Sequence, residues 1–255
     1  MMILRPVSGS PSPCKVCSAL APLFGVVDFQ RCCEIPGGKK RNLSGIPVYY
    51  RRCDGCGFLF TDAFDDWSEA DFKAHIYNAG YIEVDPDYAE QRPRNNATVV
   101  EKMFGKHKAD LRVLDYGGGN DVLCTALRGA GFPVAETYDP FVADHAQRPE
   151  GRFNLVTCFE TMEHMPDPLA GIGAILASVA ESGLVLFSTL LQPKDFDTLA
   201  LKWWYVGPRN GHVSMFSRDA LVLAWRHYGY QTASFTDNLH IAFRTLPNFA
   251  KHLVN

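Results

Sequence analysis

The chain has 255 residues, a length that suits one medium-sized domain with a small accessory domain. Its hydrophobic content of 47% is ordinary for a soluble globular protein, and no apolar run reaches the roughly eighteen residues of a membrane span. The net charge of −3 is uneven: residues 1–60 hold eight basic and three acidic residues, whereas the remainder holds seventeen and twenty-five. A body this acidic makes nucleic acid an unfavourable partner, because RNA binding needs a continuous basic surface.

The cysteines fit a reducing compartment better than an oxidising one. The N-terminal apolar stretch is too short for a secretory signal, so we expect a cytoplasmic protein. In that compartment the eight cysteines indicate metal ligands or free thiols rather than disulfides. Cys124 and Cys158 fall in apolar segments, where we expect them to be small buried side chains.

Two short cysteine pairs predict a metal site. Cys14 and Cys17 form one Cys-x-x-Cys pair, and Cys53 and Cys56 form a second pair that Gly57 follows. Two intervening residues let both thiolates of a pair face one metal, and Gly57 permits the positive φ of such a turn. Four thiolates suit tetrahedral zinc and leave no open position, so we expect a structural zinc ion. A redox dithiol is the alternative, although neither pair lies in a βαβ pattern.

The segments around and after the second pair predict two small structural regions. Strand-like runs flank the pair, as in a zinc ribbon, and we expect a zinc-ribbon-like domain at residues 1–60. Residues 61–105 predict a helical segment, with apolar helical spacing at 67–77 and 97–104. Prolines at 86 and 93 break that pattern between the two helices.

From residue 111 onward strands and helices alternate along the chain. Alternating βα units indicate a parallel sheet that helices cover on both faces. The predicted strands are 111–115, 133–138, 153–158, 183–189, 231–236 and 240–245, and the predicted helices are 121–130, 168–180 and 217–228.

A glycine turn joins the first of these strands to the first helix. The strand ends in Asp115, and Gly117, Gly118 and Gly119 follow before the helix. This is the layout of a nucleotide-binding βα turn, in which glycines let backbone N–H groups approach a ligand. Val122 holds the place of the third glycine of a dinucleotide fingerprint. An acid two residues before Gly117 suits a ligand that carries an ammonium group better than one that carries a pyrophosphate.

A second acid ends the next strand. Asp139 lies twenty-two residues after Gly117, at the end of the predicted strand 133–138. A carboxylate in that place accepts both hydroxyls of an adenosine ribose. Alone, a run of glycines can be a flexible turn, and an aspartate at the end of a strand can be a helix cap. The order and spacing of Asp115, the glycine turn and Asp139 together indicate a nucleoside site.

With these residues in place, the segment from about Leu111 onward resembles the class I S-adenosylmethionine-dependent methyltransferases. Further stretches match a bacterial small-molecule branch of that family: 153–160, Glu160-Thr-Met-Glu-His164 with Pro166-Asp-Pro168, 183–189, and 204–212 with Phe216-Ser217. The resemblance implies S-adenosylmethionine as cofactor, in a core at residues 106–255 whose cleft the segment 61–105 covers. It implies the cofactor-binding residues Asp115, Tyr116, Gly117, Gly119, Asp139, Phe159 and Glu160.

The chain departs from the family pattern after Asp139. Only thirteen residues, 140–152, separate the second strand from the fourth, where the family fits a helix and a third strand. We therefore expect an α/β, Rossmann-like, mostly parallel sheet with helices on both faces, a third strand that is short or missing, and a small N-terminal four-cysteine zinc ribbon.

Methyl transfer to a poor nucleophile such as a hydroxyl or a carbon acid needs a base. His164 is one candidate, since it follows the fourth strand and histidine titrates near neutral pH. His212, in a loop rich in glycine and asparagine, is the other. Glu163 would orient the base or hold a substrate ammonium; the structural alternative is that Glu163 and His164 cap a helix start.

The predicted function is methyl transfer from S-adenosylmethionine to a small molecule. The cysteine pairs resemble those of sugar C-methyltransferases, which implies a sugar or other anionic metabolite as acceptor. One alternative is an rRNA methyltransferase with a zinc-binding N-terminal domain. Another is a non-catalytic binding protein of the same fold, and an NAD enzyme is a weaker one. We expect neither a membrane nor a nucleic acid as partner.

Overall fold

The computed structural model describes residues 2–33 and 41–253. Two compact units share the chain: the first comprises Met1–Pro86, Met162–Gly171 and Thr189–Ala224, and the second comprises Asp87–Thr161, Ile172–Ser188 and Trp225–Asn255. Both units are therefore built from separated stretches of sequence. The domain boundaries expected at residues 60 and 105 stay a prediction, and residues 34–40 of the predicted first domain lie outside the described residues.

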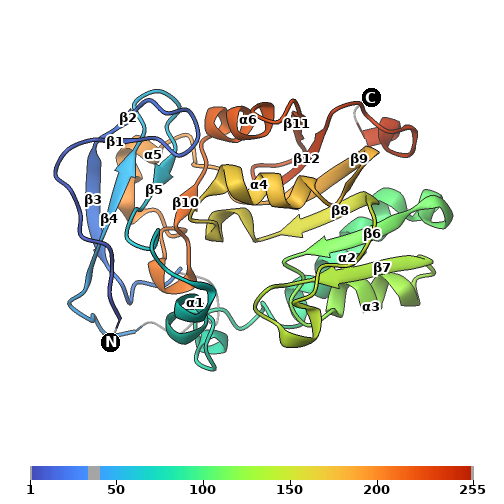
Figure 1. The fold of residues 1–255 in the computed structure, drawn as a ribbon, viewed down its shortest axis with the longest axis horizontal. Coiled ribbons are helices and arrows are strands. Elements are labelled where there is room, and N and C mark those ends of the chain that lie inside the picture. The colour runs from blue at the N-terminus through green and yellow to red at the C-terminus, as the bar shows by residue number, and fades with distance from the viewer. Residues whose placement is uncertain (1, 34–40, 254–255) are drawn as a thin grey trace. The chain divides into compact units, whose positions relative to one another are not determined.

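A six-stranded sheet forms the centre of the second unit (Figure 1). Its order is β11-β12-β9-β8-β6-β7, in which the four strands β6 to β9 pair in parallel and β12 and β11 pair antiparallel. This confirms the predicted α/β, mostly parallel sheet. The strands are β6 (Arg112–Tyr116), β7 (Val134–Tyr138), β8 (Phe153–Phe159), β9 (Val179–Ser188), β11 (Gln231–Ser234) and β12 (Leu239–Phe243).

Helices cover both faces of this sheet. On one face α2 (Gln91–Phe104) and α3 (Val122–Gly129) share an apolar cluster with strand residues such as Leu186. The next residue, Phe187, points to the opposite face because side chains alternate along a strand. There its ring lies 4.9 Å from that of Trp225, in α6 (Arg218–Arg226). The arrangement follows from β8 and β9, whose near-continuous apolar sequence requires cover on both sides.

The predicted loss of the third strand is confirmed. Between β7 and β8 the chain forms a single 3-10 turn, Ala143–His145, and no strand, although the structure describes all of these residues. As a result β7 is an edge strand of the sheet. The remaining elements of this unit are η2 (Gly105–Asp110) and η7 (Asn248–Leu253), and the unit shares α4 (Pro168–Leu176) with the first.

Several element boundaries differ from the sequence-based expectation. Helix α2 begins at Gln91 and so includes Pro93, at which the sequence predicts a break. A proline fits there because the first turn of a helix has no intrahelical partner for its N–H groups. Strand β9 begins at Val179 rather than at 183, so α4 ends four residues earlier than expected.

The first unit carries an antiparallel sheet in the order β10-β5-β4-β3. The predicted strands beside Cys53 and Cys56 are present as β4 (Pro47–Arg52) and β5 (Leu59–Phe60). Strand β10 (Ser214–Met215) joins them from much later in the chain. The other elements are β1 (Ser12–Pro13), β2 (Leu20–Ala21), β3 (Leu23–Asp28), α1 (Glu69–His75), η1 (Tyr81–Glu83), η4 (Met162–His164), α5 (Phe196–Leu199), η5 (Ala200–Lys202) and η6 (Pro208–Asn210).

None of the helices in the described part of the chain combines the length and apolar character needed to span a bilayer.

Candidate functional site

The glycine turn follows β6 in the second unit, and its shape depends on missing side chains. Gly117 and Gly119 have φ values of +78° and +57°, in the left-handed region that favours glycine. A Cβ on Gly117 would lie 2.6 Å from Thr161 Oγ1, and a Cβ on Gly118 would lie 2.5 Å from Asp115 Oδ2. Nothing lies within 4 Å of the Cβ position of Gly119, so the turn is open at that residue.

Asp115 is a buried carboxyl directly beneath this turn. Only 4% of the residue is exposed, and Thr157 donates a hydrogen bond of 2.6 Å to its Oδ1. Burial raises the pKa of Asp115 to about 7, because removal from water disfavours the charged form. The hydrogen bond from Thr157 acts in the opposite direction and is the smaller effect. A carboxyl with a strongly raised pKa beside an open backbone turn is typical of a binding or catalytic site.

Asp139 connects the end of β7 to the same turn. Its Oδ2 accepts a 3.0 Å hydrogen bond from the Gly119 amide, and its Oδ1 accepts one of 2.8 Å from the Phe141 amide. Asp139 is half-buried. The two backbone hydrogen bonds hold its carboxylate beside the turn.

Aromatic and acidic side chains complete this edge of the sheet. The rings of Tyr116 and Tyr138 lie 5.1 Å apart, and the Arg148 guanidinium lies over both. At the end of β8, Glu160 has a φ of +48°, an uncommon conformation for a residue with a side chain. Ser188 Oγ donates a 2.7 Å hydrogen bond to Glu160 Oε1 and accepts one of 2.9 Å from the Glu160 amide. A backbone held in such a region by its surroundings often marks a functional site.

The residues present fit the cofactor that the sequence predicts. All the predicted cofactor residues lie in the second unit, at or just after the carboxyl ends of β6, β7 and β8, where open α/β sheets bind ligands. The turn offers backbone amides where a side chain would clash, and acids stand on both sides of it. Their assignment as the S-adenosylmethionine site stays a prediction.

Sequence reasoning missed two hydroxyl groups in this edge of the sheet. Thr157 is the register partner of Asp115 across β6 and β8, and Ser188 ends β9 beside Glu160. A polar residue inside an apolar strand was the available signal, but its partner depends on the strand register.

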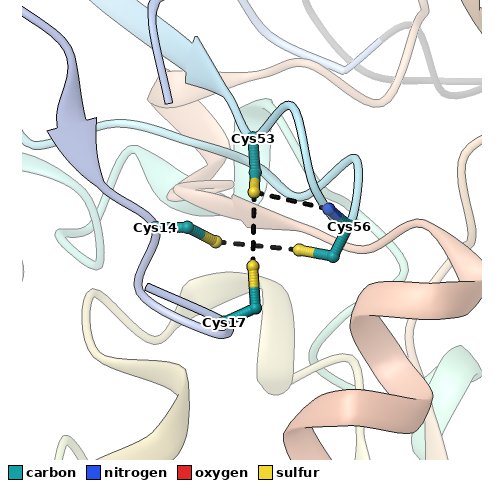
Figure 2. Close-up of side chains that lie close together, drawn as sticks. All are labelled: Cys14, Cys17, Cys53 and Cys56. Atoms are coloured by element: carbon teal, nitrogen blue, oxygen red, sulfur yellow. Dashed lines mark hydrogen bonds between the residues drawn. The ribbon is translucent and has the colours of Figure 1, made fainter. Parts of the chain in front are cut away.

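The four predicted zinc ligands meet in the first unit. Figure 2 shows the side chains of Cys14, Cys17, Cys53 and Cys56 pointing toward one centre. The Sγ atoms of Cys14 and Cys56 are 3.7 Å apart, and those of Cys17 and Cys53 are 3.4 Å apart. One pair lies between β1 and β2 and the other between β4 and β5, so two hairpin turns supply the ligands.

This geometry fits zinc. A tetrahedral zinc with bonds of about 2.3 Å to sulfur places its ligands about 3.8 Å apart, close to both observed spacings. Backbone amides of Val16, Gly55 and Cys56 donate to the sulfur atoms, which stabilises thiolates. Gly57 has the expected positive φ, at +72°. Cys124 and Cys158 are fully buried, as expected.

The three predicted catalytic residues also lie together, in the first unit. Ligand atoms of Glu163, His164 and His212 are all within 4.8 Å of one another. The two imidazole rings meet edge to face with centroids 4.9 Å apart. Glu163 is completely buried, and Tyr205 donates a 2.7 Å hydrogen bond from its hydroxyl to Glu163 Oε1.

Local backbone features bring this cluster together. Glu163 and His164 lie in η4, and the Val213 amide donates to the Glu163 carbonyl, which fixes the segment that carries His212. Gly211 has a φ of +87°, and a Cβ there would lie 3.0 Å from His164 Nδ1. Glycine is therefore required at 211 for the backbone to approach the His164 ring. Sequence reasoning proposed the two histidines as rivals and did not foresee that they touch.

A protein-family model described as a methyltransferase domain matches residues 88–234, which is more than half of the chain.

Among the curated relatives that match part of this chain are two proteins named as ubiquinone biosynthesis O-methyltransferases. The protein from Vibrio campbellii is 49% identical over 118 residues, which cover 36% of this chain and 48% of the relative. The protein from Sodalis glossinidius is 36% identical over 151 residues, which cover 48% of this chain and 59% of the relative. The chain thus spans about half the length of the curated relatives that it matches.

Solved structures with a similar arrangement share little sequence with this chain. One is the magnesium protoporphyrin IX methyltransferase of Synechocystis with bound S-adenosylhomocysteine, with a TM-score of 0.45 and 15% identity over 61% of this chain and 83% of that one. From the match of the family model, the chain belongs to the methyltransferase-domain family, within class I of the S-adenosylmethionine-dependent methyltransferases.

Proposed function

We propose that the protein transfers the methyl group of S-adenosylmethionine to a hydroxyl oxygen of a small organic molecule. The observation that carries the proposal is the glycine turn with Asp115 beneath it and Asp139 beside it, in a chain of the methyltransferase family. The two relatives described above are O-methyltransferases of ubiquinone biosynthesis, which favours oxygen as the acceptor atom.

In this proposal the second unit holds the methyl donor. Asp139 accepts the ribose hydroxyls, and its bonds to the Gly119 and Phe141 amides keep its carboxylate in place for them. Asp115 pairs with the ammonium group, whose charge would favour the ionised form of a carboxyl whose pKa burial raises to about 7. Tyr116, Phe159 and Glu160 line the remainder of the site. When bound, the cofactor supplies a sulfonium methyl group that a nucleophile attacks in line.

The rest of the reaction consists of orientation and proton removal. Holding the acceptor in line with the methyl group and excluding water supplies a large part of the rate. A hydroxyl is a poor nucleophile until it loses its proton. We assign that task to the cluster of Glu163, His164 and His212, the residues predicted to be catalytic.

A second candidate function is methyl transfer to carbon. The four-cysteine cluster favours it, because the cysteine pairs resemble those of sugar C-methyltransferases. The two candidates share the donor site and differ only in the acceptor.

The test uses S-adenosylmethionine with an isotopically labelled methyl group and a panel of catechols, phenols, nucleotide-linked keto-sugars and ribosomal RNA. The proposal expects label in a methyl ether of a hydroxylated compound, identified by mass and by the NMR shift of the methyl group. Label on a sugar carbon would support the second candidate instead. Label that enters only ribosomal RNA would overturn both.

A further inference from the structure

We propose that Glu163, His164 and His212 form a second metal site, which binds a divalent transition metal of the zinc type. The site is separate from the four-cysteine cluster and has a different donor set, two imidazole nitrogens and one carboxylate oxygen.

The hydrogen bonds of the two histidines decide which nitrogen is available to a metal. His164 Nδ1 lies 3.1 Å from the Gly211 carbonyl oxygen, and His212 Nδ1 lies 2.7 Å from the Tyr205 carbonyl oxygen. A carbonyl oxygen can only accept, so in each ring Nδ1 carries the proton and donates it. In the neutral form of each ring, Nε2 then carries the lone pair. A metal-binding histidine normally has this arrangement, in which the second nitrogen donates to a carbonyl or carboxylate.

The carboxylate is oriented in the same way. Tyr205 holds Glu163 Oε1 through its hydroxyl and holds His212 through its carbonyl, so one residue fixes two of the three ligands. Tyr205 is itself 2% exposed, and its ring centroid lies 4.2 Å from that of His212. Hydrogen bonds of this kind orient the side chains that would bind a metal directly.

Spacing and charge favour an ion at the centre of the three. The ligand atoms lie at most 4.8 Å apart, and bonds of about 2.0–2.1 Å to a tetrahedral metal bring such atoms to about 3.4 Å. Metal binding would therefore draw the three side chains closer together. Ionised, the fully buried Glu163 carries a charge away from water, and a divalent cation offsets the cost of burying it.

The ligand count indicates a reactive rather than a structural site. Two histidines and one glutamate leave the fourth position of a tetrahedral metal open, as in catalytic zinc sites. The class of ligand for that position is an oxygen donor, either water or a hydroxyl. This last step rests on the proposed function: a metal at this site would hold the acceptor hydroxyl and lower its pKa, so that its proton passes to solvent water rather than to the two histidines.

Metal analysis tests the binding claim without any methyl acceptor. Protein purified without chelator should carry two zinc ions per chain, one for each cluster. Glu163→Gln and His212→Gln should each lose one ion and keep the other, whereas Cys53→Ser should lose the cysteine-bound ion. His75→Gln is the matched control: this partly buried histidine of the same unit stacks on Trp67, outside the cluster, and the variant should keep both ions.

Cobalt distinguishes the two sites by spectrum. Thiolate-bound cobalt shows intense charge-transfer absorption, and the histidine–carboxylate site should add weaker visible bands without it. Tyr205→Phe, which removes only the hydroxyl, should weaken cobalt binding at the second site about 10–100-fold and leave the thiolate bands unchanged.

Wild-type protein with a single metal, held by the cysteines, would overturn the proposal. So would Glu163→Gln and His212→Gln variants that bind cobalt as the wild type does. If a ligand variant does not fold, the cobalt titration of Tyr205→Phe still tests whether the second site binds metal. Methylation assays that fail while the second ion is present would count against the proposed function alone.

Discussion

At the scale of single residues, burial of the Asp115 carboxyl lowers the stability of the folded state at neutral pH. Its pKa is raised to about 7, mainly by burial, although Thr157 donates a hydrogen bond to it. In the unfolded chain an aspartate titrates near pH 4. Between pH 4 and 7 the folded state therefore binds more protons than the unfolded state, so stability falls as the pH rises through this window and stays low above it.

Asp115→Asn should remove that pH dependence. The amide cannot ionise and keeps the shape of the side chain, so the variant should be more stable than the wild type above pH 7, by about 2–4 kcal/mol. The variant should also bind S-adenosylmethionine more weakly, because the ammonium group loses its partner. Urea unfolding at pH 5 and pH 8 measures the first effect and calorimetry the second. Equal free energies of unfolding for the wild type and the variant at pH 8 would show that burial of Asp115 does not destabilise the fold.

At the scale of elements, the glycine turn between β6 and α3 depends on two different properties of glycine. Gly117 needs both a positive φ and space, since Thr161 Oγ1 would lie 2.6 Å from a Cβ. Gly119 needs only the positive φ, because its Cβ position is open. The cost of a side chain should therefore differ between the two.

Gly119→Ala should lower stability by about 1–2 kcal/mol, the usual cost of left-handed backbone for alanine. Gly117→Ala should cost clearly more, because the clash with Thr161 adds to the same backbone strain. Thermal unfolding measures both. The double variant Gly117→Ala with Thr161→Ser is a check, since loss of the Thr161 methyl should recover part of the difference. Equal losses for the two single variants would contradict the clash.

Strands were largely predictable where the signal is a pattern of neighbouring residues in the sequence. Apolar runs predicted β6, β7 and β8 to within a residue or so, and the thirteen residues after Asp139 predicted the missing third strand. Strand β10 was not predicted, because two residues, Ser214 and Met215, form a strand only through their pairing with β5. Pairing of this kind depends on contacts between distant segments, which no local pattern records.

At the scale of the whole molecule, the chain builds two units from interleaved segments. Sequence reasoning placed the four cysteines together because their spacing is a local signal. It treated His164 and His212 as rival bases and did not foresee their contact, because forty-eight sequence positions and a return of the chain to the first unit separate them. The candidate site was thus predictable as a set of residues but not as two separate clusters.

Loss of zinc should affect the first unit far more than the second. Cys53→Ser should lose the cysteine-bound ion, and zinc-finger peptides derive about 10–16 kcal/mol from such an ion. Hydrogen exchange should then rise across β3, β4 and β5 and stay low across β6, β8 and β9. Cys32→Ser, a half-buried cysteine outside the cluster, is the matched control and should exchange like the wild type. Uniform loss of protection over both units would contradict separate stabilisation.

The most direct test of the central claim is calorimetry of S-adenosylmethionine binding to the wild type and to Asp139→Ala. The account predicts binding of one cofactor per chain, weakened in the variant by about 1–3 kcal/mol because a charged hydrogen-bond acceptor is lost. Asp144→Asn, which changes an exposed acid a few residues away, should bind like the wild type. No binding to the wild type, or equal binding to the wild type and to Asp139→Ala, would contradict the assignment of the cofactor site.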